Sequence, residues 1–310
     1  MLPPNAGGPR CLKYGVTRNY ITGLEVVLAN GEVLRTGGRV HKNKTGFDLI
    51  GLFVGSEGML GIVTEITVKL LPLPPACATL SASFNSMSEA AAMVQQIFAA
   101  GFLPSSLEIA DKFTLEAARQ DSGAAHVPSG NAHLLVDLDG QDQAVDAEMQ
   151  KMRDLIQSRK PTALEIATNE TDCEKLWALR RQFSNSLRAT GLTKLNEDIV
   201  VPRSRLVDLI AFAEALSGRS GFPIACFGHA GDGNIHVNLM ADRYNREAAV
   251  REKVRGVLDE LFAQVLAWGG VITGEHGIGL AKKRWWPEAS SEVARAFIRR
   301  SSALSIQTIF

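Results

Sequence analysis

Residues 226–240 read CFGHAGDGNIHVNLM, and this stretch predicts a β-hairpin. After the turn signal GDGN, apolar and polar side chains alternate with a period of two, which is typical of a strand. His236 and Asn238 therefore share one face of the second strand, and the apolar residues share the other. The polar face either binds a ligand or faces water.

The composition is that of an ordinary globular protein. The chain has 310 residues, of which 45% are hydrophobic and 21% charged, with 33 basic and 33 acidic residues. This length accommodates one large domain or two or three smaller ones. The balanced charge gives no basic footprint for a nucleic acid. No apolar stretch approaches the ~18 to 20 residues of a transmembrane helix, and the N-terminus lacks the layout of a signal peptide.

The four cysteines, Cys11, Cys77, Cys173 and Cys226, lie far apart and form no CxxC pair. This spacing is typical of reduced thiols rather than of a disulfide framework or a zinc knuckle. We therefore expect a soluble protein of the cytoplasm.

The sequence divides into three zones. Residues 1–75 are glycine-rich and strand-like, with a hairpin predicted around the turn pair Asn30-Gly31, and a proline-rich LPLPPA ends them. From 76 to 285 strands alternate with helices, which predicts an α+β sandwich with helices on one face of the sheet. Residues 286–310 predict a short amphipathic helix and a tail.

One predicted helix carries the run WALRRQFSNSLRA. The pattern Thr171-x-x-Glu174 predicts a capping box at its start. Further along the chain, Ser204 and Gly218 are expected to bracket another helix.

His229 and His236 lie on the two sides of the glycine turn, and the glycine-padded loop GGVITGEHGIGLAKK (269–283) contains Glu275 and His276. Two histidines and a glutamate suit Zn²⁺ or Mn²⁺ and leave one coordination position open for a substrate oxygen. Any one histidine alone is as well explained by a hydrogen-bonded surface or core position. The joint pattern favours a ligand, because neighbouring glycines allow a close approach to the backbone.

A third cluster consists of Arg180, Ser184 and Lys194, with the first two at i and i+4 on one helix face. Cations beside a hydroxyl suit a carboxylate-bearing substrate, whereas spacing alone favours a solvated helix face. The run GSEGMLGIVTEI (55–66) is neither a Rossmann fingerprint nor a P-loop. It predicts either a structural turn or a backbone cradle for a nucleotide cofactor.

Several motifs occur in the order found in the FAD-linked oxidase family, which the chain therefore resembles. That family includes D-lactate dehydrogenases, the FAD subunit of glycolate oxidase and D-2-hydroxyglutarate dehydrogenases. The motifs are NAGGPRCLKYG (5–15), VGSEGMLGIVTEITVKLLP (54–72), NEDIVVP (196–202), FGHAGDGNIHVN (227–238) and GEHGIG (274–279), supported by SLEIADKF (106–113) and LLVDLDG (134–140).

The resemblance implies a domain organisation. Residues 1–75 would form the C-terminal portion of a PCMH-type FAD-binding domain. Residues 76–285 would form a ferredoxin-like, antiparallel-sheet cap domain, and residues 286–310 a divergent tail returning towards the FAD domain. The family's FAD domain begins well before NAGG, and members end in a DP…NPGK segment that is absent here. We therefore expect the N-terminal part of the FAD domain to be lacking, and apolar surface to be exposed on residues 16–70 unless a partner chain covers it.

The resemblance also implies a reaction, in which a small D-2-hydroxy acid of the D-lactate or glycolate class is oxidised to the 2-oxo acid with hydride passing to flavin N5. His276 would be the base that takes the hydroxyl proton. The metal, Zn²⁺ or Mn²⁺, would be held by His229, His236 and Glu275. The substrate would be held by Arg180, Ser184, Lys194 and Asn238. The FAD would be held by Asn5, Gly7, Gly8, Gly15, Gly55, Glu57, Gly58, Gly61, Ile62, Val63 and Asn234.

The expected partners are the 2-hydroxy acid and either a partner subunit or an electron acceptor, such as an iron–sulfur protein, a quinone or a cytochrome. The expected location is the cytoplasm or the inner face of the membrane. The alternative function is a truncated, non-catalytic paralogue or subunit that keeps the cap fold without binding FAD by itself. A flavin-free metal hydrolase would leave residues 54–72 without a purpose.

Overall fold

The computed structural model describes residues 5–123 and 127–306. These residues form two compact units. Unit 1 consists of residues 5–8, 15–73 and 273–306, and unit 2 of residues 9–14, 74–123 and 127–272. The division after Leu73 lies close to the proline-rich boundary expected from the sequence, but residues 273–285 cluster with unit 1 instead of unit 2. The last residues of the expected tail, 307–310, lie outside the described part of the chain.

Unit 1 is built on a three-stranded antiparallel sheet in the order β2-β1-β3. Its strands are β1 (Ile21–Val27), β2 (Val33–Gly37) and β3 (Ile62–Val68), and its helices are η1 (Thr17–Tyr20), α2 (Leu49–Phe53), α9 (Trp286–Ala289) and α10 (Glu292–Ile306). The predicted hairpin is confirmed, since β1 pairs with β2 across a turn in which Gly31 adopts a φ of 85°.

The core of unit 1 is small. Leu24 and Val26 of β1 pack with Phe53 and Val54 at the end of α2. As expected for residues 16–70, large apolar side chains are exposed around it: Val33, Val40, Phe47, Leu52, Met59, Ile62, Ile66, Val68 and Leu70.

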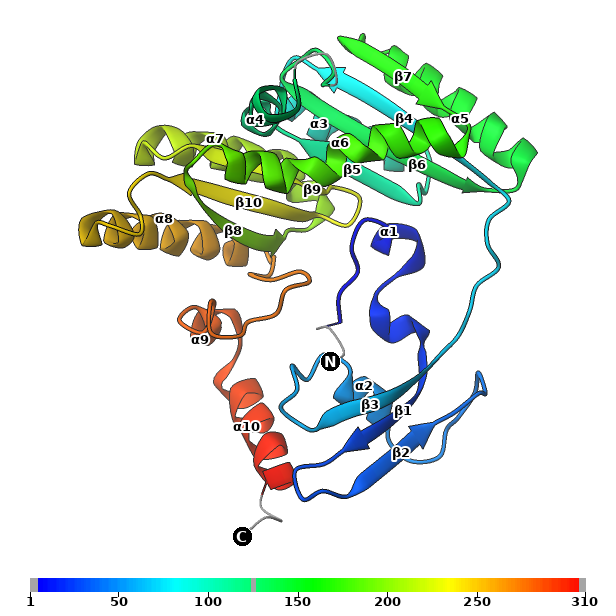
Figure 1. Cartoon of the computed structure of the whole chain (residues 1–310), viewed down its shortest axis with the longest axis vertical. Helices are drawn as coiled ribbons and strands as arrows, with labels where there is room; N and C mark the ends of the chain where they lie inside the picture. Colours follow the sequence, from blue (N-terminus) through cyan, green and yellow to red (C-terminus); the bar gives the residue numbers. More distant parts are fainter. Residues whose placement is uncertain (1–4, 124–126, 307–310) are drawn as a thin grey trace. The chain divides into compact units, whose positions relative to one another are not determined.

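Unit 2 is built on a seven-stranded antiparallel sheet in the order β7-β4-β6-β5-β9-β10-β8 (Figure 1). Its strands are β4 (Ala76–Phe84), β5 (Ser106–Ala110), β6 (Ala132–Gly140), β7 (Ala163–Ala167), β8 (Thr193–Val200), β9 (Ile224–His229) and β10 (Asn234–Ala241). Its helices are α1 (Cys11–Tyr14), α3 (Met87–Ala99), α4 (Lys112–Ser122), α5 (Asp142–Gln157), α6 (Glu170–Ala189), η3 (Arg203–Arg205), α7 (Leu206–Ser220) and α8 (Ala248–Ala267).

The two faces of this sheet differ in chemistry although both are buried. One face is apolar and includes Leu80, Leu107, Val136, Ile199, Val237 and Leu239. The strand register places the following buried polar residues on the other face: Thr79, Ser81, Ser83, Ser106, Glu108, His133, Asp137, Asp198, His229, Asn234, His236 and Asn238. We call this second surface the polar face.

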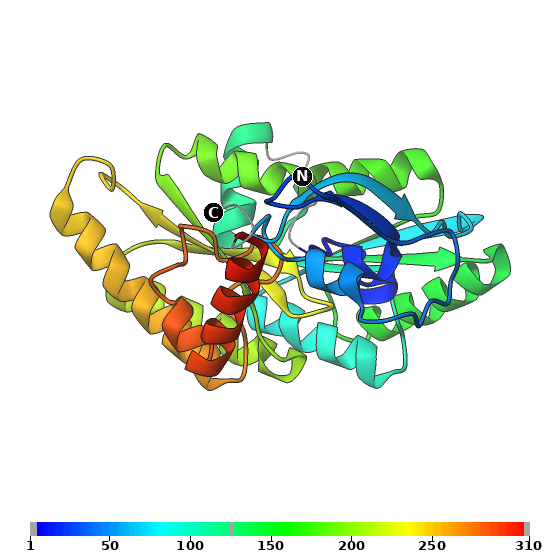
Figure 2. The ribbon, with the colours of Figure 1, turned by 90° about the horizontal axis from the view of Figure 1, so that it is seen from below.

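The expected α+β class is confirmed, and the helices are distributed more widely than on the single face predicted. Helices α3, α5, α7 and α8 lie along one side of the sheet and α4 and α6 along the other, as Figure 2 shows. Helix α6 covers the polar face, because its Arg180 and Trp177 side chains donate to Glu108 and Asp137 on the sheet. His236 and Asn238 on the polar side of β10 are buried, so this side does not face water.

Two helix ends differ from the sequence predictions. Helix α6 begins at Glu170, with the Asn169 side chain accepting from the backbone N–H of Asp172, so the capping box predicted at Thr171 is wrong. Helix α7 continues through Gly218 and ends at Ser220, where Gly221 adopts the left-handed conformation that terminates helices.

Candidate functional site

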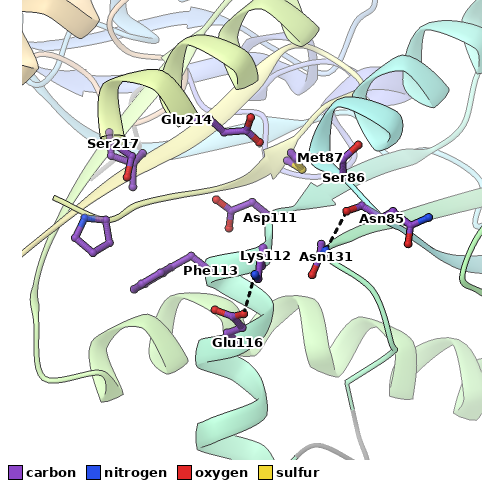
Figure 3. Close-up of a pocket in the computed structure, with 12 residues that line it drawn as sticks. Asn85, Ser86, Met87, Asp111, Lys112, Phe113, Glu116, Asn131, Glu214 and Ser217 are labelled. Atoms are coloured by element: carbon purple, nitrogen blue, oxygen red, sulfur yellow. Dashed lines mark hydrogen bonds and ion pairs between the residues drawn. The ribbon is translucent and has the colours of Figure 1, made fainter. Parts of the chain in front are cut away.

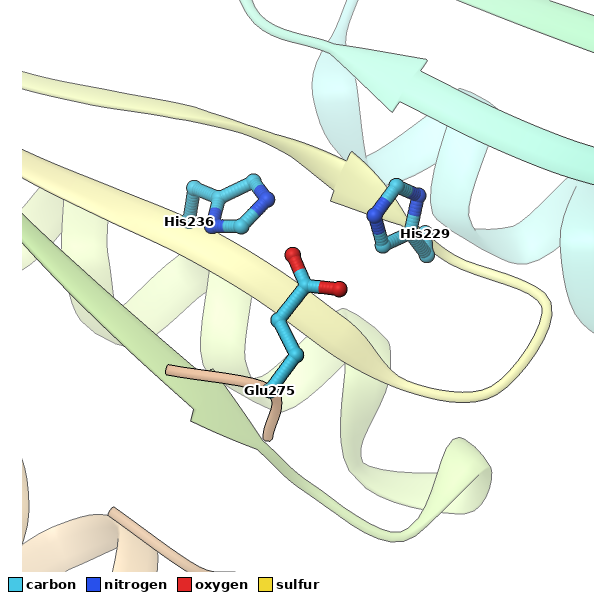
Figure 4. Close-up of side chains that lie close together, drawn as sticks. All are labelled: His229, His236 and Glu275. Atoms are coloured by element: carbon cyan, nitrogen blue, oxygen red, sulfur yellow. The ribbon is translucent and has the colours of Figure 1, made fainter. Parts of the chain in front are cut away.

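The predicted hairpin of residues 226–240 is confirmed as β9 and β10, which pair antiparallel. It brings His229 and His236 together: their ring centroids are 5.6 Å apart with planes at 78°, and each is less than 8% exposed. Figure 4 shows the two imidazoles side by side on neighbouring strands, and a ligand nitrogen of each lies within 4.8 Å of the other. Two Zn–N bonds of about 2.0–2.1 Å span about 4 Å end to end, so this donor pair fits one divalent ion.

Glycines and one asparagine hold the hairpin in place. A Cβ added to Gly228 would lie 2.6 Å from the Asn234 carbonyl oxygen, so the two strands approach closely only because this residue is glycine. The side-chain amide of Asn234 donates to Asp198 Oδ1 at 2.7 Å and to the Ile199 carbonyl at 2.8 Å on β8. Asn234 was predicted to bind the cofactor, and the structure shows it tying β10 to β8.

Glu108 on β5 connects the histidine pair to helix α6. Its Oε1 is 2.6 Å from Nδ1 of His229, and its Oε2 is 2.6 Å from both Nε and Nη2 of Arg180. Burial raises the pKa of Glu108, but the charges of Arg180 and His229 and their hydrogen bonds outweigh it and lower the pKa to about 2. The carboxylate is therefore charged. Glu108 was not predicted from the sequence. A signal was present, because an acidic residue between the apolar Leu107 and Ile109 of a strand indicates a buried charge with a specific role.

The predicted cation cluster lies over the same polar face, where Arg180 and Lys194 are close to the ring of Phe227. Lys194 Nζ donates to Ser184 Oγ at 2.7 Å, and Arg188 Nη1 donates to the same oxygen at 3.2 Å. Burial, together with the charges of Arg188 and Arg180, lowers the pKa of Lys194 to about 8. The Arg180 side chain is 12% exposed, so the solvated helix face favoured by spacing alone is not what forms. A concentration of partly buried positive charge favours an anionic ligand.

Phe227 links the cations to the histidines and was also missed in the sequence. Its ring centroid is 4.9 Å from the Arg180 guanidinium carbon, 5.6 Å from Lys194 Nζ and 5.4 Å from the His236 ring centroid. The cations stack against the aromatic face, which restricts their movement.

Two asparagines add hydrogen-bond acceptors to the polar face. The Asn238 amide nitrogen donates to the carbonyls of Ala225 and His236 at 3.0 and 2.9 Å. Its Oδ1 is buried and has no hydrogen-bond partner within residues 5–123 and 127–306. The same holds, over those residues, for Oδ1 of Asn196, its register partner on β8. Buried polar atoms are nearly always bonded, so these two acceptors indicate a place for a donor from a ligand. Asn196 was not among the residues predicted from the sequence.

Within unit 1, the loop that contains Glu275 and His276 contacts two glycine-rich segments. Gly8 donates its backbone N–H to Glu275 Oε2 at 3.0 Å. The Glu57 carboxylate accepts from the backbone N–H groups of Ile278 and Gly279 at 3.0 and 3.2 Å. Glu57 was predicted to bind the cofactor, and here its carboxylate supports the loop.

The two predicted catalytic and metal-binding residues of this loop are close to each other. His276 Nε2 is 3.9 Å from Glu275 Oε1, and the His276 side chain is 48% exposed. Glu275, the third residue drawn in Figure 4, belongs to unit 1, whereas both histidines belong to unit 2.

The other predicted cofactor residues fall into two groups within unit 1. Gly61 and Val63 serve the sheet: a Cβ on Gly61 would lie 2.7 Å from Val26 Cγ1, and Val63 packs on the core. The remaining residues lie in two segments that approach each other, since a Cβ on Gly55 would lie 3.5 Å from Asn5 Cβ. These are Asn5, Gly7, Gly8, Gly15, Gly55, Gly58 and the exposed Ile62.

Positive φ angles occur at Gly8, Gly15, Gly55 and Gly58, and a Cβ added to Gly8 would meet nothing within 4 Å. The open backbone at Gly8 fits a place where a nucleotide cofactor could approach closely.

A cavity of about 440 Å³ lies where β5 ends and β9 begins, away from His229 at the other end of β9 (Figure 3). None of the predicted site residues lines it. One half-buried lining residue, Asp111, accepts from the backbone N–H groups of Thr114 and Cys226 at 2.9 and 2.6 Å. Burial raises the pKa of Asp111 to about 6 in spite of these bonds. Asp111 therefore caps α4 and anchors β9.

Two protein families match the chain. The family described as FAD linked oxidases, C-terminal domain, matches residues 73–303, and the family described as FAD binding domain matches residues 1–37. Within the described ranges, none of the helices combines the length and the apolar character needed to span a membrane.

Two curated relatives are similar to most of the chain. The glycolate oxidase subunit GlcD of Bacillus subtilis is 40% identical over 278 residues, which is 90% of this chain and 59% of that protein. The D-lactate dehydrogenase of Anaerostipes hadrus is 30% identical over 302 residues, which is 93% of this chain and 62% of that protein. The chain thus spans about three fifths of the length of the curated relatives it matches.

Solved structures agree on the fold. p-Cresol methylhydroxylase with substrate bound matches 96% of this chain and 64% of its own length, with a TM-score of 0.69 and 16% identity. An alkyldihydroxyacetonephosphate synthase matches 98% and 56%, with a TM-score of 0.64 and 18% identity. At this identity the likeness concerns the fold alone, and it confirms the expected fold class.

Proposed function

Since the chain belongs to the family of FAD-linked oxidases, we propose that it takes part in the oxidation of a small D-2-hydroxy acid, of the D-lactate or glycolate class, to the 2-oxo acid. One observation carries this proposal. On the buried polar face of unit 2, the ring of Phe227 contacts two cations and His236, and His236 in turn contacts His229. A 2-hydroxy acid presents a carboxylate and a hydroxyl on adjacent carbons, which matches cations and metal ligands in such proximity.

The substrate carboxylate, in this proposal, binds Arg180 and Lys194. Arg180 offers the N–H groups that Glu108 does not use, and Lys194 offers a charged amine on a hydroxyl support, Ser184. Asn238, whose Oδ1 is buried, is a further proposed contact of the bound substrate. These contacts orient the substrate before the reaction and exclude water from one side of it.

His229 and His236 are the proposed ligands of a divalent ion, Zn²⁺ or Mn²⁺, with Glu275 as the third. Val271, four residues before Glu275 in the sequence, is paired with Val200 of β8. His276, next in sequence to Glu275, is the proposed acceptor of the hydroxyl proton.

The chemistry supplied by the bound groups is Lewis-acid activation of the hydroxyl by the metal and acceptance of hydride by FAD. The glycine segments of unit 1 are the proposed FAD contacts of this chain, namely the exposed Gly7, Gly55 and Gly58 and the half-buried Asn5, Gly8 and Gly15. Electrons would leave through a partner subunit or acceptor, either an iron–sulfur protein, a quinone or a cytochrome. We place the protein in the cytoplasm.

Flavin binding and flavin reduction test this function. Purified protein is mixed with FAD, and the visible absorbance is followed while D-lactate, glycolate or D-2-hydroxyglutarate is added without oxygen. We expect bound flavin that one of these acids bleaches, and slower bleaching in Arg180→Lys with flavin binding retained. Protein that binds no flavin under any condition would contradict the enzymatic function and favour the non-catalytic subunit.

A further inference from the structure

Glu108 lies between two residues to which the proposed function gives different tasks, a metal ligand and a substrate-binding cation. Each of its carboxylate oxygens serves one of them: Oε1 contacts His229 and Oε2 contacts Arg180. We infer that Glu108 is a positioning residue that fixes the tautomer of His229 and the orientation of Arg180 with one carboxylate. This inference rests on the proposed function and adds to it a residue that makes the two binding groups depend on each other.

The His229 contact determines which ring nitrogen carries the proton. A carboxylate that receives two N–H groups from a guanidinium is ionised and has no proton to donate. The hydrogen at the 2.6 Å contact therefore belongs to Nδ1 of His229. In the neutral imidazole, the form that binds a metal, the lone pair is then on Nε2, and Nδ1 is held by a supporting carboxylate.

The Arg180 contact determines which N–H groups remain for a ligand. Nε and Nη2 are 2.6 Å from Glu108 Oε2, and the guanidinium stacks on the Phe227 ring at 4.9 Å. An arginine has five N–H donors in a planar fork. With one edge fixed by Glu108 and one face fixed by Phe227, the donors left over have a single orientation.

The length of the Glu108 side chain allows its carboxylate to reach both His229 and Arg180. His229 is on the adjacent strand β9, directly opposite Glu108 in the register, whereas Arg180 is on the covering helix α6. The carboxylate reaches both because it stands away from the sheet by two methylenes. An aspartate at this position keeps the charge and loses the reach.

Asp137 provides a matched control on the same polar face. It is 6% exposed and lies on the neighbouring strand β6. It also binds helix α6, through Trp177 Nε1 at 2.8 Å, and it accepts from Thr79 on β4 at 2.6 Å. Replacing Asp137 removes a buried carboxylate and a contact to α6 without touching His229 or Arg180 directly.

The experiment is nitrogen NMR of the metal-free chain, labelled with ¹⁵N in histidine and arginine. The His229 and Arg180 signals are assigned by their loss in His229→Asn and Arg180→Lys. We expect the Nδ1–H tautomer at His229 in the wild type. Glu108→Gln should shift both the His229 ring signals and the Arg180 Nε–H signal, whereas Asp137→Asn should shift neither.

Metal affinity gives the functional readout. Titration with Zn²⁺ should show an affinity lowered by about 10- to 100-fold in Glu108→Gln, the usual effect of losing a residue that orients a metal ligand, and an unchanged affinity in Asp137→Asn. Glu108→Asp keeps the charge but should shift the same two NMR signals. It replaces Glu108→Gln in the test if Glu108→Gln does not fold.

Three results would overturn the inference: an Nε2–H tautomer at His229 in the wild type, a shift of only one of the two signals in Glu108→Gln, or equal shifts in Asp137→Asn. Failure of the proposed metal centre looks different. A wild-type chain that binds no Zn²⁺ but shows both coupled NMR shifts supports the role of Glu108 and contradicts the metal ligands.

Discussion

Leu107 and Glu108 are neighbours on β5, and each is 1% exposed, yet they belong to opposite faces of the same sheet. Leu107 points to the apolar face, which hydrophobic burial stabilises. Glu108 points to the polar face, where it is paired with Arg180 and His229. A buried charged group of this kind contributes little to stability compared with an apolar side chain of similar size. Equal burial on the two faces therefore serves different ends, stability on one and, in the proposed function, ligand binding on the other.

Removing a proposed metal ligand from the polar face should weaken metal binding more than any other change considered below. We expect His236→Ala to weaken Zn²⁺ or Mn²⁺ binding by on the order of 100-fold or more, because losing a residue that only supports a ligand already costs about 10- to 100-fold. Isothermal titration measures the affinity. His41→Ala, at an exposed position of unit 1, is the control and should bind like the wild type. Equal metal affinity in His236→Ala and the wild type would refute the ligand assignment.

The apolar face should respond in stability alone. Leu107→Ala is expected to lower the free energy of unfolding by about 2–5 kcal/mol, because it removes buried methyl groups and leaves a cavity. Urea denaturation measures this change, and Leu280→Ala, at a position that is 90% exposed, should leave it near the wild-type value. Metal affinity of folded Leu107→Ala should be unchanged. A loss of metal binding comparable to that in His236→Ala would mean that the two faces are not separable.

His133 tests the polar face through acid stability. Burial, with a smaller effect of Arg180, lowers its pKa from 6.5 to about 4. The unfolded chain therefore binds a proton at His133 before the folded chain does, so stability is full above pH 6.5 and falls as the pH drops towards 4. The shift corresponds to about 3 kcal/mol.

Urea denaturation between pH 7 and pH 4 should show that the free energy of unfolding falls more in the wild type than in His133→Gln. The raised pKa of Asp111 acts in the opposite direction in both proteins and cancels in the comparison. Identical pH profiles for the two proteins would show that His133 does not remain neutral in the fold.

The smallest expected effect concerns substrate affinity at high pH. Lys194, whose pKa is lowered to about 8, is charged at pH 7 and loses its charge as the pH rises through this value. The dissociation constant for D-lactate should therefore rise by up to about tenfold between pH 7 and pH 9. Calorimetry measures it. Lys194→Arg stays charged and should show a flat profile, and a wild-type profile equally flat would remove Lys194 from the site.

Much of the fold follows from local patterns. The alternation after Gly233 predicts the strand β10 and the common face of His236 and Asn238, and the register with β9 confirms both. The capping box at Thr171 failed because Asn169 begins the helix earlier with a side-chain oxygen of the same kind. Local patterns identify possible caps, but competition among neighbouring caps is resolved only in the folded chain.

The candidate site was predictable in part. The pairing of His229 with His236 follows from a hairpin, whose geometry is local, and Arg180 with Ser184 follows from helix spacing. Glu108 and Phe227 join these groups across strands and a helix far apart in the sequence. Nothing in the period of a strand says which helix covers its polar face, so these two residues could not be placed before the fold was known.

In the proposed function, the β9–β10 hairpin on the polar face of unit 2 binds a divalent metal. The most direct test is a crystal structure of the protein grown with Mn²⁺, with anomalous diffraction recorded for the metal. We predict an anomalous peak for manganese within bonding distance of a nitrogen of His229 and a nitrogen of His236, with Nδ1 of His229 still held by Glu108. Crystals in which manganese is bound elsewhere, or in which these two imidazoles hold no metal, would contradict the claim.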